Sequence, residues 1–172
     1  RGPREGRGVL VKLPPFAQAL RPYQVAALEA VLAAFRAARS VLLVMPTGTG
    51  KTVVFAALAA LARGKGRVLV IAHREELLEQ ARERIATTTG LKVEIEAGEK
   101  RVDVDDLPDV VVASVQTLAR ASRRERFSPK AFVLAIVDEC HHAVSATYRD
   151  ALDHFSGAKV LESSAISRTL TS

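Results

Sequence analysis

Several kinds of residue and segment are scarce in this sequence. Cys140 is the one cysteine, so no disulfide can form within the chain. This is typical of a reducing compartment, and we expect the protein to work in the cytoplasm. No apolar run approaches the roughly 18 residues that a membrane-spanning helix needs, and residues 1–8 are polar with no apolar segment after them. We therefore expect neither a signal peptide nor a membrane partner.

Glycine and proline are also limited, with 10 and 7 among 172 residues, which is too few for a fibrous or disordered chain. Apolar residues make up 48% of the sequence, enough for a sizeable core in a chain of single-domain length. Lysine and arginine outnumber the acidic residues by 25 to 19, giving a net charge of +6. This charge is compatible with a polyanionic partner such as nucleic acid, without establishing one.

The order of predicted elements indicates an α/β fold. Pro22 suits the first position of a helix, where its missing N–H has no cost, and apolar residues continue at helical spacing toward Ala38. Apolar runs then alternate with helical stretches, which predicts a parallel sheet with helices on both faces. We expect residues 1–15 to be a flexible basic lead, residues 16–172 to be the domain, and residues 120–130 to be a solvated loop. The predicted strands are 41–44 and 68–71, both buried, 92–95, 110–113, 132–137 and 159–161, and the predicted helices are 52–61, 75–85 and 116–122.

A glycine-rich loop lies between the first of these strands and the helix that follows it. Residues 45–52 read MPTGTGKT, and Gly48 and Gly50 allow successive N–H groups to turn toward a phosphate. The helix that starts near Lys51 adds its positive end, Lys51 could reach the β- and γ-phosphates, and Thr52 could bind magnesium. Met45 stands where the strict pattern has its first glycine. The alternative is an ordinary strand–turn–helix with a surface lysine.

An acidic pair ends the strongest predicted strand. Phe132–Val137 runs directly into Asp138 and Glu139, and the carboxyl ends of parallel strands face the crevice in which ligands bind. Asp138 could hold magnesium, and Glu139 could orient and deprotonate an attacking water. Adjacent residues on a strand point to opposite faces, so the pair should lie where the chain turns. The alternative is an acidic cluster at the start of a helix, favoured by the helix dipole.

These two motifs, MPTGTGKT and VDECH, resemble those of the DExH-box group of superfamily 2 helicases, and further segments occur in that family's order. LRPYQ, which ends at Gln24, resembles the adenine-reading Q motif. Together with AHREELLEQ and DECHH, it resembles the type III restriction-enzyme-like DExH helicases in particular. The resemblance implies a RecA-like P-loop NTPase domain that binds ATP and Mg²⁺. The implied nucleotide contacts are Arg21, Gln24, Pro46, Thr47, Gly48, Thr49, Gly50, Lys51 and Thr52, with Lys51, Asp138 and Glu139 catalytic and Thr52 and Asp138 on the metal.

Three more segments resemble the nucleic-acid motifs of this family. AHREELLEQ from Ala72 resembles motif Ia, Ala97–Glu99 resembles motif Ib, and SVQTL from Ser114 resembles a motif whose threonine contacts a backbone phosphate. Because the carboxyl ends of parallel strands share one edge of the sheet, these residues could line one groove that binds phosphates without reading bases. The implied nucleic-acid residues are His73, Arg74, Gly98, Ser114, Gln116 and Thr117, with DNA favoured over RNA.

Local alternatives stay open for several of these residues. Gln24 could be an exposed residue at the start of a helix. His73 and Arg74 could form a polar helix start. Ser114 and Thr117 could simply cap the helix after the strand, which is what such residues do most often.

Two features depart from the family. KVLESSAISR contains Ser164 and Ala165 where motif III has S/T-A, but Ile166 stands in place of its threonine and Ser167 in place of its proline. We expect the second RecA-like domain, with its arginine fingers, to be absent from this chain. Since such a finger is worth roughly 10³–10⁵ in rate, we expect the chain alone to be a very weak ATPase. The parent protein would be an ATP-driven helicase or translocase; the alternatives are another P-loop ATPase and a non-catalytic, nucleotide-dependent nucleic-acid-binding module.

Overall fold

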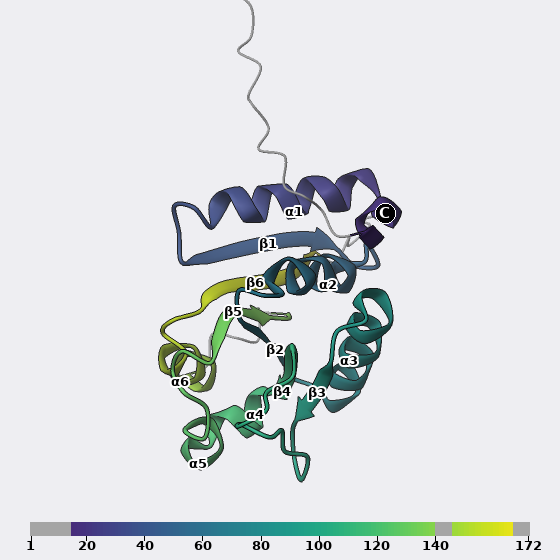
Figure 1. Ribbon diagram of the computed structural model, residues 1–172. Coiled ribbons are helices and arrows are strands. Elements are labelled where there is room, and N and C mark those ends of the chain that lie inside the picture. The colour runs from purple at the N-terminus through teal and green to yellow at the C-terminus, as the bar shows by residue number, and fades with distance from the viewer. Residues whose placement is uncertain (1–14, 140–145, 167–172) are drawn as a thin grey trace, which may run out of the picture.

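The computed structural model describes residues 15–139 and 146–166. A six-stranded sheet in the order β1-β6-β5-β2-β4-β3 lies at its centre (Figure 1), and the neighbouring strands are parallel. No helix within the described ranges is long and apolar enough to cross a membrane. The strands are β1 (Ser40–Pro46), β2 (Arg67–Ala72), β3 (Val93–Glu96), β4 (Val110–Ser114), β5 (Phe132–Val137) and β6 (Lys159–Ile166). The helices are η1 (Pro15–Ala19), α1 (Pro22–Ala34), α2 (Lys51–Ala62), α3 (Glu75–Thr89), α4 (Val115–Ala119), α5 (Ala121–Arg124) and α6 (Ala146–His154).

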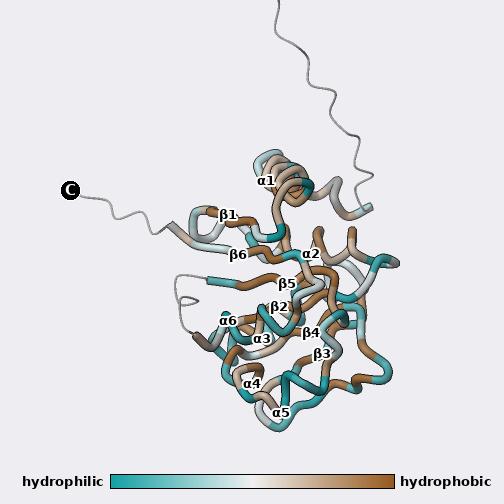
Figure 2. The backbone as a smooth tube through the Cα atoms, turned by 90° about the vertical axis from the view of Figure 1, so that its left-hand side faces the viewer, coloured by the Kyte–Doolittle hydropathy of each residue, from teal (hydrophilic) through white to brown (hydrophobic). Residues whose placement is uncertain are grey.

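A separate apolar core covers each face of the sheet. On one face α1, α2 and α3 pack against alternate strand residues such as Val68 and Val70. On the other face α4 and α6 pack against the intervening residues, such as Leu69 and Ile71. Figure 1 shows α3 on one side of the strands and α5 and α6 on the other, and Figure 2 shows hydrophobic chain along the central strands. The predicted α/β fold with helices on both faces is confirmed.

Most predicted elements are confirmed, and a glycine C-cap explains the boundary of α3 that differs from the prediction. α1 begins at Pro22 and ends at Ala34, four residues before its predicted end. α2 begins directly after Gly50, whose φ of 80° is left-handed. α3 continues past its predicted end at residue 85 because Gly90, with φ of 69°, supplies the left-handed residue that ends it. β5 has the predicted bounds.

The prediction of a buried strand at 41–44 is correct for one face only. Leu43 and Met45 are buried, whereas Leu42 and Val44 are 58% and 45% exposed. β1 lies at an edge of the sheet, and within the described ranges the second core does not extend to it. An apolar run cannot reveal this difference, because burial on the second face depends on which elements lie beside the strand.

The prediction of a solvated loop at 120–130 is correct only in part, because most of its residues are exposed but two are buried and four are helical. Residues 121–124 form α5, and the predicted helix at 116–122 is divided between α4 and α5. Arg123 is 5% exposed and Phe127 is 2% exposed. The run of arginines favours a solvated segment in sequence terms, but the Arg123 guanidinium pairs with the buried Glu96 carboxylate, a partner that lies far away in the sequence.

Helix α6 was not predicted, although its periodicity is present in the sequence. Tyr148, Ala151 and Phe155 recur at helical spacing and are buried in the second core. The polar residues between them concealed this pattern. α6 completes the cover of the sheet face opposite α2.

Candidate functional site

The predicted phosphate-binding loop is a tight turn at the carboxyl end of β1. Its closing contacts come from Thr49, whose N–H and hydroxyl both donate to the Pro46 carbonyl, at 3.3 and 2.6 Å. Gly48 and Gly50 have φ of 77° and 80°, a left-handed conformation that costs little only for glycine. The turn leads straight into α2 at Lys51, so the unpaired N–H groups of that helix face the space in front of the loop.

Gln24 is built into this loop. Its side chain is 6% exposed, its Nε2 donates to the Thr49 carbonyl at 2.9 Å, and its Oε1 accepts from the Arg21 N–H at 3.0 Å. The Tyr23 hydroxyl donates to the same Thr49 carbonyl at 3.0 Å and accepts from the Arg21 guanidinium at 3.3 Å. The alternative of an exposed Gln24 is therefore wrong. Tyr23 is a member of this contact that the sequence analysis missed.

The acidic pair lies where the chain turns at the end of β5, as predicted. β5 ends at Val137, and Glu139 has φ of 55°, an uncommon left-handed conformation for a residue with a side chain. Asp138 and Glu139 are both partly buried. Neither lies in the first turn of α6, which begins at Ala146. The alternative of an acidic start to a helix stays open, since residues 140–145 lie outside the described ranges. Cys140 and His141 of the motif lie outside the described residues.

Ser163 on β6 holds both members of the pair. Its hydroxyl donates to Asp138 Oδ1 at 2.8 Å and accepts from the Glu139 N–H at 3.4 Å, and the residue is fully buried. Ser163 was not among the predicted site residues, because the motif III match begins one residue later, at Ser164. A serine two residues after the predicted strand at 159–161 is the signal that could have indicated it, since a buried hydroxyl needs a partner.

The loop and the acidic pair both lie at the edge of the sheet that is formed by the carboxyl ends of its strands. β6 lies between β1 and β5 and is parallel to both. Since neighbouring strands are about 5 Å apart, β1 and β5 lie about 10 Å apart across the sheet. β1 also extends four residues further along the sheet, from the level of Glu162, where β5 ends, to the level of Ile166. Lys51 follows the first and Asp138 the second, so the two are on one rim of the sheet.

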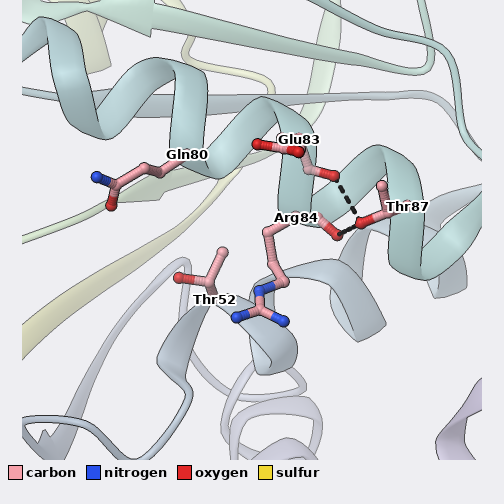
Figure 3. A pocket seen from close by; sticks show the side chains of 5 residues that line it. All are labelled: Thr52, Gln80, Glu83, Arg84 and Thr87. Carbon is pink, nitrogen blue, oxygen red and sulfur yellow. Dashed lines mark hydrogen bonds between the residues drawn. The ribbon is translucent and has the colours of Figure 1, made fainter.

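Thr52 lines a cavity of about 490 Å³ between α2 and α3. Figure 3 shows Arg84 reaching from α3 toward the first turn of α2, beside Thr52. Gln80, Glu83 and Thr87 complete the lining. The Thr87 hydroxyl donates within α3, to the Glu83 carbonyl at 2.8 Å. The cavity therefore combines a hydroxyl of the loop with a cationic side chain that no motif had indicated.

The residues present suit a nucleotide-bound Mg²⁺ better than a metal held by protein alone. Within the described ranges no three His, Cys, Asp or Glu side chains gather into a metal cluster. Magnesium typically takes one or two protein oxygens together with phosphate oxygens and water. Asp138 accepts a hydrogen bond from the Ser163 hydroxyl at Oδ1, which leaves Oδ2 as its oxygen for the metal. The Thr52 hydroxyl, in the first turn of α2, is the second protein oxygen of this set.

Four of the predicted nucleic-acid residues are exposed, namely His73, Arg74, Gly98 and Gln116. Gln116 Nε2 lies 3.0 Å from the His73 carbonyl oxygen and 3.2 Å from His73 Nδ1. This contact joins the connections that follow β2 and β4. Arg74 is the N-cap residue of α3 but makes no side-chain cap, so its guanidinium is not used to start the helix.

The other two predicted residues, Ser114 and Thr117, are each 5% exposed. Ser114 Oγ accepts from the Thr117 N–H at 3.1 Å and donates to Thr117 Oγ1 at 2.7 Å. Thr117 Oγ1 also accepts from the Gly98 N–H at 3.3 Å. The capping alternative is confirmed for Ser114, which is the N-cap of α4. The Thr117 hydroxyl thus connects α4 to the exposed Gly98.

The comparisons with known proteins agree with this geometry. The sequence matches the family described as "Type III restriction enzyme, res subunit" over residues 18–168, a span that contains the loop, the acidic pair and the strands between them. The chain belongs to this family. Membership confirms the resemblance to the superfamily 2 DExH helicases.

Two curated relatives cover most of the chain. The Saccharomyces cerevisiae protein named "Putative ATP-dependent helicase IRC3" is 38% identical over 149 residues, which is 81% of this chain and 21% of the relative. The Schizosaccharomyces pombe protein named "Putative mitochondrial ATP-dependent helicase irc3" is 35% identical over 159 residues, 89% of this chain and 25% of the relative. The chain thus spans about a fifth to a quarter of the length of these relatives.

Solved structures support the fold. A nuclease-deletion mutant of the Type ISP restriction-modification enzyme LlaGI, in complex with a DNA substrate mimic, matches 86% of this chain and 17% of that chain, with a TM-score of 0.66 and 22% identity. At this identity the likeness concerns architecture alone, and it agrees with the RecA-like arrangement of the sheet and helices.

Proposed function

We propose that this chain is the first RecA-like, ATP-binding motor domain of a superfamily 2 helicase or translocase that couples ATP hydrolysis to movement along nucleic acid. The observation that carries the proposal is that the glycine-bent loop and the Asp138–Glu139 turn flank β6 at one edge of the sheet. Family membership and two relatives named as ATP-dependent helicases support it. The proposed partner within the parent protein is a second RecA-like domain.

In this proposal the residues of the loop and the turn bind and orient the nucleotide. Lys51 and the N–H groups of the first turn of α2 neutralise the phosphates. Thr52 and Asp138 would hold a magnesium ion, which supplies further positive charge at the phosphates. Glu139 orients and deprotonates the attacking water. Ser163 keeps the Asp138 carboxylate and the Glu139 backbone in place through its two hydrogen bonds.

Gln24 and Arg21 are proposed to face the adenine. A glutamine amide has two N–H groups and two acceptor positions on its oxygen. Gln24 uses one N–H on the Thr49 carbonyl and one acceptor position on the Arg21 N–H. One donor and one acceptor position remain, which is the pair needed to bind N7 and the N6 amine of adenine.

Nucleic acid, DNA more than RNA, is the proposed partner at the edge that carries His73, Arg74, Gly98 and Gln116. The net charge of +6 favours a polyanion, and the LlaGI structure contains a DNA mimic. Contacts to backbone phosphates predict strong salt dependence and little base preference. A cytoplasmic location stays a prediction.

Substitution of the loop lysine and of the acidic pair tests the nucleotide site. Lys51→Ala removes the charge at the phosphates, and we expect the affinity for a fluorescent ATP analogue to fall at least about tenfold, since hydrogen bonds to charged groups contribute about 1.5–3 kcal/mol. Glu139→Gln in the parent protein should preserve binding of the analogue and stop turnover. Normal ATP hydrolysis by the Glu139→Gln protein would show that another group activates the water.

ATPase assays distinguish the helicase proposal from its alternatives. The parent protein should hydrolyse ATP faster in the presence of single-stranded DNA, duplex DNA or RNA. ATP hydrolysis that no nucleic acid stimulates would favour another P-loop ATPase. ATP-dependent binding of nucleic acid without hydrolysis would favour a binding module. The chain alone should hydrolyse ATP very slowly, because the arginine fingers that we assign to the second domain would be missing.

A further inference from the structure

A cluster of charged side chains near Gly98 is centred on a carboxylate that is shut off from solvent. The Glu96 side chain, at the end of β3, is fully buried and that of Arg123 is 7% exposed. Arg123 Nη2 and Nε lie 2.5 and 2.7 Å from Glu96 Oε1, and Arg126 Nη1 approaches the same oxygen at 3.2 Å. Burying charges is costly, and apolar residues of similar volume often stabilise a core as well or better. Stability alone therefore does not account for this cluster, and its role is to be sought in its other contacts.

The cluster binds the backbone of the segment that follows β3. Arg123 donates to the Gly98 carbonyl at 2.7 Å and to the Lys100 carbonyl at 2.8 Å. Arg126 donates to the Val102 carbonyl at 3.0 Å, and the Val102 N–H donates to the buried carboxylate at 2.8 Å. Alternate carbonyls of one segment are thus held by two planar guanidinium groups whose geometry the carboxylate sets.

The segment held in this way is the turn Ala97–Lys100, which follows β3 in the sequence and lies between α3 and α4 in space. Ala97 and Lys100 exchange both backbone hydrogen bonds, at 3.2 and 2.8 Å, and Gly98 has φ of 54°. On one side the Gly98 N–H reaches Thr117 in α4. On the other side the turn and α3 enclose a cavity of about 290 Å³, across which Lys100 Nζ pairs with Glu79 at 2.6 Å. The turn therefore lies between the helix that begins within motif Ia and the helix that contains most of SVQTL.

We infer that Arg123, anchored by Glu96, is a positioning residue for nucleic-acid binding. It holds the Ala97–Lys100 turn against α3 and α4, so that the phosphate-binding edge keeps one shape. The inference rests on the proposed nucleic-acid function of that edge. Arg123 is buried and does not itself reach a phosphate. Lysine at this position would keep the charge, but its single ammonium group cannot reproduce the fork that spans the carboxylate and both carbonyls.

The test compares Arg123→Lys with Arg124→Lys, a matched control on the same helix. Arg124 donates to the Leu118 and Ala119 carbonyls at the end of α4, at 2.9 and 3.2 Å, rather than to the turn. Three measurements are made on each protein. They are the affinity for fluorescein-labelled single-stranded DNA over a range of salt concentrations, the affinity for a fluorescent ATP analogue, and amide hydrogen exchange in the turn.

Arg123→Lys should speed exchange at the Lys100 and Val102 amides and weaken DNA binding about tenfold, with the salt slope reduced by about 0.7 for each phosphate that the edge no longer binds. Lysine keeps the positive charge of arginine, so the net charge of the protein does not change in either variant. A variant that merely contains fewer folded molecules would therefore bind less DNA with an unchanged salt slope. ATP-analogue affinity should stay within about twofold, as expected for a site with no shared partners. Arg124→Lys should leave DNA affinity and salt slope unchanged.

The outcomes separate this inference from the proposed function. Faster exchange with unchanged DNA affinity would overturn the positioning role and leave the proposed function standing. No binding of single-stranded DNA, duplex DNA or RNA by the unaltered chain would overturn both. If Arg123→Lys also loses the ATP analogue, and so fails to fold, Arg126→Lys replaces it, because the Arg126 side chain is 26% exposed and easier to change. Unchanged DNA affinity in that variant would likewise overturn the inference.

Discussion

Two glycine-containing turns at one edge of the sheet are held by different chemistry. In the phosphate loop, the neutral Gln24 amide and Tyr23 hydroxyl donate to the Thr49 carbonyl. In the Ala97–Lys100 turn, the buried Arg123 guanidinium binds two carbonyls and a carboxylate. A neutral hydrogen bond contributes a net of about 1 kcal/mol, whereas removing one partner of a buried ion pair costs about 3–5 kcal/mol.

This difference divides the edge into an adjustable part, the phosphate loop, and a fixed part, the Ala97–Lys100 turn. The proposed function requires the phosphate loop to bind a nucleotide and release it, which needs contacts that can be rearranged at low cost. The second turn carries Gly98 between α3 and α4, where a single shape is useful and where a strongly held backbone provides it. The predictions below separate the two turns, beginning with the largest expected effect.

The fixed turn should be sensitive to the loss of its buried carboxylate. Glu96→Gln leaves the Arg123 charge without compensation, and we expect the free energy of unfolding, measured with urea, to fall by about 3–5 kcal/mol. The Glu96→Gln/Arg123→Gln double variant should recover part of this loss, because Arg123, the more deeply buried of the two arginines that pair with Glu96, then carries no charge. A loss below about 1 kcal/mol, as for a surface pair, would show that the buried pair does not stabilise the turn in the way described.

The adjustable loop offers a matched pair of glycines. A Cβ on Gly50 would lie 2.6 Å from Gln24 Nε2, whereas a Cβ on Gly48 would meet nothing within 4 Å. Both glycines have left-handed φ, so Gly48→Ala should cost about 1–2 kcal/mol of stability. Gly50→Ala should cost more, and it should also weaken ATP-analogue binding by displacing Gln24. Equal urea midpoints and nucleotide affinities for the two variants would contradict the role assigned to the Gln24 contact.

The smallest effect is expected on the exposed side of the fixed turn. Hydrogen bonds from Lys100 and then from Arg82 lower the pKa of Glu79 from its ordinary value of 4.5. Because the folded-state pKa is lowered, the carboxylate stabilises the fold at neutral pH, and this contribution is lost as the pH falls through the lowered pKa. These side chains are largely exposed and screened by water.

We therefore expect Glu79→Gln to leave the urea midpoint at pH 7 nearly unchanged, in contrast to Glu96→Gln. Titration of the Glu79 carboxyl, followed by NMR, should give a midpoint below 4.5. A midpoint at or above that value would show that the pair with Lys100 does not form in solution.

Local patterns in the sequence determined most of the fold and half of the proposed nucleotide site. The spacing of Gly48, Gly50 and Lys51 predicted the loop. The two-residue period of strands placed Asp138 and Glu139 at a turn, where the structure has them. These predictions succeeded because backbone conformation and periodicity depend on residues that are neighbours in the chain.

Only the tertiary structure decided which distant residues complete the edge. Ser163 reaches Asp138 because β6 lies between β1 and β5, and the arginine-rich segment is buried because Arg123 meets Glu96. The exposure of Leu42 follows from the edge position of β1. Strand order brings these groups together, and strand order follows from the packing of the whole chain and not from any one segment of the sequence.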